Sequence, residues 1–270
     1  MLTSGAEGEM VKRYVVRNEP ITNETAPCLE CPVRTVTVCG FIPEAQLARD
    51  SGVRLGFRHI RAKRVFQREG DRTAEVFTVY AGWAFRFRLL PDGRRQILTF
   101  FLPGDLIGVH SLSHSAVQST LQAVNDLTLC AFDITRYKAA ARENAEPRRK
   151  LEEERRKRVQ FMDELIIDLG RRSAQERIVR LILEFYVRER ARNAVDSDSF
   201  EFPLRQEHLA DALGLTVVHV SRTLASLRAQ KLLSFTRNML KILDLQRLAA
   251  LGALDKVQIT LLFGNASGRS

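Results

Sequence analysis

The hydrophobic pattern of this 270-residue chain changes near residue 134, and the change limits the folds open to it. Before that point, stretches such as Phe77–Ala81 and Ala84–Leu89 alternate apolar and polar residues, which predicts short β-strands. Turn signals recur between such stretches, at Glu69–Asp71, Pro91–Gly93 and Pro103–Asp105. Strands at this spacing predict an antiparallel roll or sandwich that closes on itself.

A long helical segment follows the strands. Residues 134–169 contain no glycine and one proline, Pro147, which suits the first turn of a helix. Because a long helix with a single apolar seam cannot easily bury that seam within its own chain, we expect two copies to pair in parallel through it. The alternative is a helix that only caps the strand-rich domain. The residues expected in the seam are Leu151, Met162, Leu165 and Leu169.

Two short helices around Gly214 form the most specific binding element of the sequence. Residues 205–213 predict the first helix, and Gly214 allows the positive φ of a tight turn. Thr216 can then cap a second helix over residues 217–231. A β-hairpin with its turn near Asn238 is expected next, which makes a winged helix-turn-helix; a generic pair of helices is the alternative.

The second of these helices is amphipathic. Val218 is an aliphatic residue at the centre of the outward face, where a thymine methyl group would give it a partner. Arg222 can pair with O6 and N7 of guanine, which is worth about 1–3 kcal/mol of discrimination. The inward face consists of Val217, Val220, Leu224 and Leu227. The DNA-reading residues are expected to be Thr216, Val218, His219, Ser221, Arg222 and Ser226.

Composition and charge agree with a nucleic-acid partner. The formal net charge of +10 and the pI near 9.9 favour an anionic partner, and an apolar fraction of 45% indicates packed domains. No nucleophile–base group or phosphate-binding loop appears, so we expect no enzymatic activity. Residues 1–20 hold no apolar signal segment and no stretch could span a bilayer, so we expect a cytoplasmic protein without membrane contact.

Four cysteines form a second candidate site. Cys28, Cys31 and Cys39 lie close together on an irregular arm, and Cys130 lies at the end of a predicted strand. In a reducing compartment they are not expected to form disulfides. Four thiolates suit a 4Fe–4S cluster, which takes one protein sulfur per iron, and they also suit tetrahedral zinc. A thiol switch, or no ligand role at all, are the remaining alternatives.

The order and spacing of several short motifs resemble those of the CRP/FNR family of bacterial regulators. The resemblance covers about residues 28–250 and implies an α+β fold: a cyclic-nucleotide-binding-type β-roll sensor domain, a long dimerisation helix and a C-terminal winged helix-turn-helix. It also implies a homodimer on a near-palindromic double-stranded DNA operator, with RNA polymerase as a further partner. The motifs are Glu69–Asp71, Pro103–Gly108, Arg172–Arg177, Leu213–Thr216 and Ser221–Arg222.

The resemblance to the oxygen-sensing FNR branch gives the cysteines a role. That branch holds its cluster with three cysteines near the N-terminus and one in the roll, which implies a 4Fe–4S cluster on Cys28, Cys31, Cys39 and Cys130. An intact cluster would tie the arm to the roll and favour pairing, and oxygen would reverse both. The alternatives are the same fold responding to another small ligand, to thiol oxidation or to zinc, and a zinc-stapled nucleic-acid-binding scaffold that does not switch.

Two positions distinguish this chain from parts of the family. Members that bind cyclic AMP carry an Arg-Ser pair after the turn that corresponds to Pro103–Gly108, whereas residues 110–119 contain no arginine, so we expect no cyclic nucleotide. Oxygen-sensing members usually carry glutamate at the position of Val218, so a different half-site is expected.

The chain is expected to divide into five parts: an arm (1–40), the roll (41–140), the dimerisation helix (141–170), the DNA-binding domain (171–252) and a tail (253–270).

Overall fold

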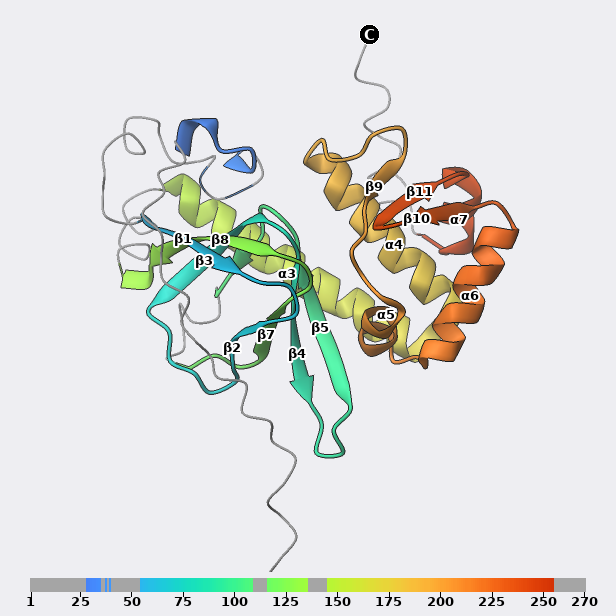
Figure 1. Ribbon diagram of the computed structural model, residues 1–270, viewed down its shortest axis with the longest axis horizontal. Coiled ribbons are helices and arrows are strands. Elements are labelled where there is room, and N and C mark those ends of the chain that lie inside the picture. The colour runs from blue at the N-terminus through green and yellow to red at the C-terminus, as the bar shows by residue number, and fades with distance from the viewer. Residues whose placement is uncertain are drawn as a thin grey trace, which may run out of the picture.

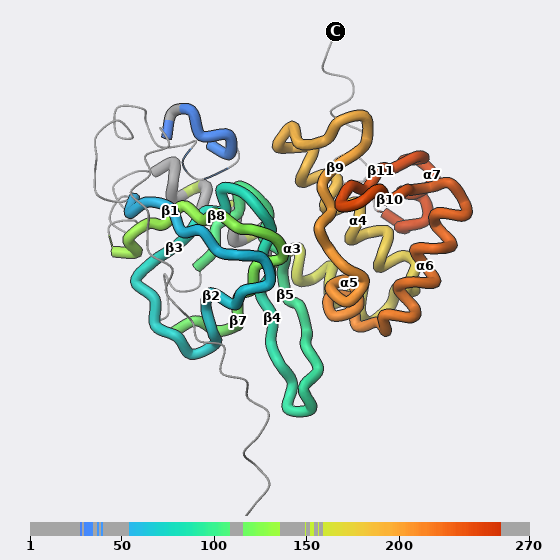
Figure 2. Tube along the Cα trace, in the orientation of Figure 1, coloured from blue at the N-terminus to red at the C-terminus, as the bar shows by residue number. Residues whose placement is uncertain are grey.

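The computed structural model describes residues 28–34, 37, 39, 54–108, 116–135 and 145–254 (Figure 1). Two bodies lie side by side, and one long helix runs from the first to the second, as the trace in Figure 2 also shows. Most of the expected arm, the tail beyond Leu254 and part of the segment without arginine lie outside the described residues.

The first body is the expected β-roll. Its strands form two four-stranded antiparallel sheets, in the orders β1-β8-β3-β6 and β2-β7-β4-β5. Both strands predicted by alternation are present as β3 and β4. The strands are β1 (Arg54–Ile60), β2 (Val65–Gln67), β3 (Glu75–Ala81), β4 (Ala84–Leu89), β5 (Arg95–Phe101), β6 (Leu106–Ile107), β7 (Thr120–Ala123) and β8 (Leu127–Asp133).

Alternation along these strands builds the interior of the roll. Phe77 and Val79 on β3 and Leu127 and Leu129 on β8 are buried, because every second residue of a strand points to the same face. One glycine is required where the β3–β4 turn meets the opposite loop. Gly82 has a φ of +82°, and a Cβ there would lie 2.2 Å from the carbonyl oxygen of Asp126. No other residue fits this position without moving the backbone.

Two helices carry the chain out of the roll: α3 (Ala145–Arg171) and α4 (Ala174–Ala191). Their boundary is fixed by a capping box at the start of α4. The backbone N–H of Ser173 donates to Glu176 at 2.6 Å, and the backbone N–H of Glu176 donates to the Ser173 hydroxyl at 3.3 Å. The motif Arg172–Arg177 is therefore explained by local structure, because it contains the end of the connection from α3 and the capping box that begins α4.

The second body is the expected winged helix-turn-helix. Gly214 follows α5 with a φ of 63°, as the tight turn requires, and the wing turns at Arg237–Asn238 between β10 and β11. The strand β9, which completes a sheet in the order β10-β11-β9, was not predicted because three residues show no period. The elements are β9 (Ser199–Glu201), α5 (Gln206–Leu213), α6 (Val217–Ala229), β10 (Leu233–Thr236), β11 (Met239–Ile242) and α7 (Leu245–Leu251).

Candidate DNA interface and cysteine site

The second helix of the helix-turn-helix, α6, is anchored by its apolar face and capped at its first turn. Val220, Leu224 and Leu227 are buried as predicted, whereas Val217 is 47% exposed, so its inward placement is wrong. Val217 is the first residue of the helix and precedes the turn that packs on the domain. The Thr216 hydroxyl accepts a hydrogen bond from the backbone N–H of His219 at 3.2 Å, which confirms the predicted cap.

The structure places the predicted DNA-reading residues together on α6 and its cap. Val218 is 59% exposed, and the side chains of His219 and Arg222 are also exposed. Ser221 is partly buried, and the hydroxyl of Ser226 accepts a hydrogen bond from Gln230 at 3.0 Å. Since Thr216 and Ser226 already have partners within the helix, Val218, His219 and Arg222 are the side chains freest to meet a base edge.

The cysteines of the arm and the roll share one end of the molecule. Cys28 lies in the short helix η1 (Cys28–Glu30), and Cys39 and Cys130 both pack against the buried pair Val76 and Phe132. The Nε atom of Arg54 donates a hydrogen bond to the Cys130 Sγ at 3.3 Å, and the same guanidinium lies 4.6 Å from the centre of the Phe57 ring. All four thiols are free and partly buried.

Burial makes three of these thiols, those of Cys31, Cys39 and Cys130, poorer acids. The pKa of Cys39 is raised to about 12, chiefly by burial and to a smaller extent by the nearby thiols, while a hydrogen bond with Thr37 opposes the shift. Burial also raises the pKa of Cys130 to about 11, although Arg54 opposes the shift, and it raises the pKa of Cys31. Protonated thiols are weak nucleophiles, which counts against a simple thiol switch.

The four thiols match a metal site in kind but are not assembled into one. They influence one another electrostatically, so they lie in the same region. Within the part of the chain that the structure describes, however, no three His, Cys, Asp or Glu side chains form a group that could hold a metal ion. The number and kind of donors fit a 4Fe–4S cluster or zinc.

The exposed apolar face of α3 differs from the predicted seam. Met162 is exposed, but Leu165 and Leu169 are partly buried, and the described side chains do not include Leu151. Leu169 lies close to Gly214, 3.4 Å from where a Cβ would stand. Among the described side chains of α3, the large apolar residues that are exposed are Val159, Met162, Ile166 and Ile167, and the first three follow one another at spacings of three and four.

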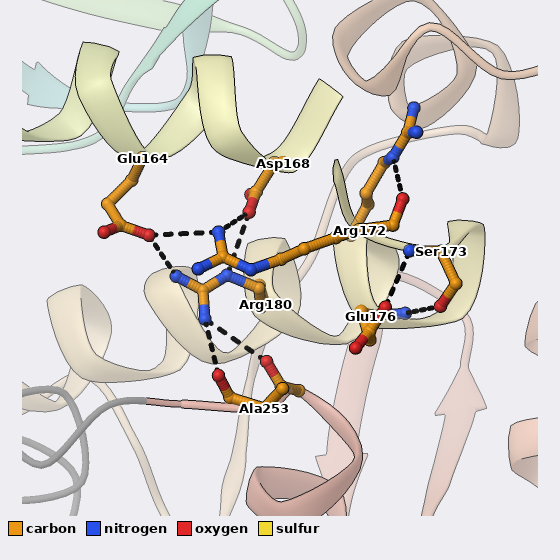
Figure 3. Close-up of polar contacts among 9 residues, drawn as sticks. Glu164, Asp168, Arg172, Ser173, Glu176, Arg180 and Ala253 are labelled. Atoms are coloured by element: carbon orange, nitrogen blue, oxygen red, sulfur yellow. Dashed lines mark hydrogen bonds and ion pairs between the residues drawn. The ribbon is translucent and has the colours of Figure 1, made fainter. Parts of the chain in front are cut away.

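A polar network that the sequence did not reveal joins α3 to α4 (Figure 3). The Arg180 side chain is 5% exposed and forms ion pairs with Glu164 at 2.5 Å and with Asp168 at 3.0 Å. Arg172 contacts the same two carboxylates. Arg180 also donates to the carbonyl oxygen of Gly252 at 3.2 Å, so the end of α7 is held at this junction. In the sequence, this network was indicated only by Glu164, Asp168 and Arg172, charged residues spaced one turn apart on α3.

Two domain models match the chain. The Crp-like helix-turn-helix domain matches residues 176–251, and the cyclic nucleotide-binding domain matches residues 57–144. The nitrogen fixation regulation protein FixK of Bradyrhizobium diazoefficiens is 31% identical over 227 residues, which is 84% of this chain and 94% of FixK. The chain belongs to the CRP/FNR family of transcription regulators.

Other members of the CRP/FNR family agree with this assignment. The transcriptional activator protein FnrL of Cereibacter sphaeroides is 28% identical over 204 residues, 74% of this chain and 81% of FnrL. The solved structure of FixK2 from Bradyrhizobium japonicum is similar with a TM-score of 0.67 and 28% identity, over 74% of this chain and 98% of FixK2. This CRP/FNR chain is therefore a transcription regulator rather than an enzyme, and its expected fold is confirmed.

The basic stretch that contains the predicted DNA-reading residues of this CRP/FNR regulator extends beyond them. From Gly214 to Leu243 the sequence contains no aspartate or glutamate. Its additional cations, all exposed, are Arg228, Lys231, Arg237 and Lys241, at the end of α6 and on the wing. The absence of carboxylates from this stretch could have been recognised in the sequence as an indication of a phosphate-binding surface.

No helix among the described residues is long and apolar enough to cross a membrane.

Proposed function

We propose that this regulator binds a near-palindromic DNA operator as a homodimer, through α6 and the wing of each copy. The observation that carries the proposal is the exposed outward face of α6, which lies in a stretch from Gly214 to Leu243 that contains cations and no aspartate or glutamate. Cations on such a surface contact phosphates and fix the register, while side chains at the start of the recognition helix read base edges. RNA polymerase is the expected further partner, by membership of the family.

Base reading is assigned to two side chains. Arg222 would donate to O6 and N7 of a guanine, and Val218 would contact a thymine methyl group in the major groove. Val218 has no hydrogen-bonding group, so it cannot accept from cytosine N4 as a glutamate at this position would. We therefore expect a half-site with one guanine that is essential and a nearby thymine that is recognised by its methyl group.

Pairing is assigned to α3. The exposed residues Val159, Met162 and Ile166 form a stripe that water would otherwise cover, and a second copy of α3 in parallel would bury it. Leu165 and Leu169 would lie at the inner edge of this stripe. A two-fold axis along α3 would relate the two recognition helices, which is why the operator should be nearly palindromic.

We further propose that the four cysteines hold a 4Fe–4S cluster and make DNA binding responsive to oxygen or redox state; zinc without oxygen sensing is the second candidate. Such a cluster supplies redox chemistry that oxygen can alter. Arg54 would hold Cys130 in place and offset the negative charge of the thiolates. A tie between the arm and β8 would be transmitted to α3, which follows the roll.

Two measurements test these assignments. Enrichment of duplexes from a random library by the wild-type protein, followed by gel-shift titration, should give one nearly palindromic sequence; the absence of any enriched sequence would contradict the DNA assignment. Anaerobic purification should give a brown protein with iron and an absorbance near about 400 nm that changes in air. A colourless protein that contains zinc would favour the second candidate, and neither metal after reconstitution would end both.

A further inference from the structure

A salt bridge joins the sensor roll to the helix-turn-helix. The Nε and Nη2 atoms of Arg95, at the start of β5, lie 2.7 and 2.6 Å from Oδ2 of Asp211 on α5. The two side chains are only 21% and 29% exposed. The neighbouring Gln96 donates through Nε2 to the carbonyl oxygen of Ala212 at 3.1 Å, so the same strand holds α5 by both a side chain and the backbone.

The Arg95 guanidinium is fixed within the roll before it reaches Asp211. It lies over the rings of Phe85 and Phe87, 5.1 and 5.4 Å from their centres. Its Nη1 atom donates to Oε1 of Gln122 at 3.3 Å. Contacts on three sides leave the side chain little rotational freedom, so forming the bond to Asp211 costs little further entropy.

Apolar contacts continue this connection along the domain boundary. The Trp83 and Phe100 rings of the roll lie 5.0 and 5.4 Å from the Phe185 ring on α4. Asn125 donates to Glu201 at 3.1 Å on the far side of the boundary. Domains joined by a single linker are expected to move relative to each other unless their interface is large and apolar. Here a buried aromatic cluster spans the boundary, and Arg95 lies where that cluster meets α5.

We propose that Arg95 is a positioning residue that fixes the orientation of α5 and α6 relative to the roll and α3. This inference rests on the proposed function, in which two copies pair through α3 and read two half-sites. If the orientation is fixed in each copy, the separation of the two recognition helices is fixed in the dimer. The protein then discriminates between operators by the spacing of their half-sites as well as by their bases.

The experiment compares the wild type with Arg95→Met on duplexes that keep both half-sites and differ only in spacing. Methionine keeps an aliphatic stem over the two rings and loses the bond to Asp211. Arg94→Met is the matched control, because Arg94 lies on the same hairpin and pairs with Asp92 at 2.7 Å, within the roll. We expect one inserted base pair to weaken binding about tenfold for the wild type and Arg94→Met, but at most about threefold for Arg95→Met.

Two further variants keep the proposal falsifiable if Arg95→Met folds poorly. Asp211→Asn should relax spacing discrimination in the same way, and the exchanged pair Arg95→Asp with Asp211→Arg should restore part of it. Equal spacing penalties in the wild type, Arg95→Met and Asp211→Asn would overturn the proposal. Failure of the wild type to select any operator would instead contradict the proposed function, so the two failures are distinguishable.

Discussion

The Nδ1 atom of His208 accepts a hydrogen bond from the backbone N–H of Arg205 at 3.0 Å, which caps the first turn of α5. The ring also packs against Phe85 of the roll, with 5.4 Å between ring centres. Burial lowers the pKa of His208 from 6.5 to about 4. A protonated ring would lose the acceptor that the cap requires, so this residue links helix capping to the domain boundary.

This arrangement predicts a stability that depends on pH. Because the pKa of His208 is lower in the folded state, the unfolded chain takes up the proton first as pH falls. The contribution of His208 is complete above pH 6.5 and is lost progressively between pH 6.5 and about 4, with a total on the order of 3 kcal/mol. The variant His208→Gln keeps a capping acceptor at this position. Its free energy of unfolding, measured with urea at several pH values, should lack the decrease that His208 causes as pH falls. Identical pH profiles for both proteins would contradict the assignment.

The buried network at Arg180 predicts a large loss of stability on its removal. Arg180→Met would leave Asp168 and Glu164 with Arg172 alone, and breaking a buried ion pair from one side costs about 3–5 kcal/mol. The control is Arg247→Met, because Arg247 is mostly exposed and lies 3.9 Å from Asp244. That variant should change the free energy of unfolding by less than about 0.5 kcal/mol. Comparable values for the two variants would show that the network contributes little.

Arg222 and Arg228 should affect DNA binding differently. Arg222→Ala should abolish the preference for guanine at the base pair that Arg222 reads while the fold stays intact, with a loss of about 1–3 kcal/mol of discrimination. Arg228→Ala should weaken binding to all duplexes alike and reduce its salt dependence, as expected of a phosphate contact. Gel-shift titrations at several salt concentrations, with circular dichroism for the fold, separate the two. Operator affinity unchanged in Arg222→Ala would defeat the base-reading role.

Val218 can be tested atom by atom. Replacing the recognised thymine by uracil removes only its methyl group, so the wild type should bind the uracil operator several-fold more weakly, by about 1 kcal/mol. Val218→Ala should bind both operators with similar affinity. The two changes form a double-mutant cycle, and its coupling free energy measures the contact between Val218 and the thymine methyl group. If the uracil penalty is as large for Val218→Ala as for the wild type, the methyl group meets another residue.

The exposed stripe on α3 predicts which substitutions break the dimer. Ile166 is 66% exposed, so Ile166→Glu should leave each copy folded and raise the dimer dissociation constant about 100-fold or more, because each dimer loses two apolar contacts and gains two buried charges. Arg171→Glu at the exposed end of α3 serves as a charge control. Sedimentation analysis of both variants gives the result. A dimer that survives Ile166→Glu would move the seam toward Leu165 and Leu169.

The sequence was sufficient where one local pattern determines the structure. Alternation identified β3 and β4, and Gly214 with Thr216 identified the turn and cap of the helix-turn-helix. It was insufficient where partners are distant in the chain. Arg95 and Asp211 lie 116 residues apart and no periodicity relates them.

Helix faces show the same limit. On α3, a shift of one residue in the predicted apolar positions moves the seam around the helix. Packing within the chain, rather than spacing, determines which apolar side chains stay exposed and can contact a second copy. Similarly, Val217 has the right spacing to be inward but is the first residue of α6, and it remains 47% exposed. The sequence identifies the four cysteines as possible metal ligands. It does not give the distance between the arm and β8, because no local pattern specifies the backbone between them.

The carbonyl groups that Arg180 holds set a limit on how far this chain can be shortened. Its Nη1 atom donates to Gly252 at 3.2 Å and to Ala253 at 3.4 Å, beside the junction of α3 and α4. A stop codon after Leu254 keeps both acceptors, whereas one before Gly252 leaves a buried cation short of them. A fluorophore attached at residue 254 would therefore lie beside the junction of α3 and α4, where its signal would report on any change in the relative position of these two helices.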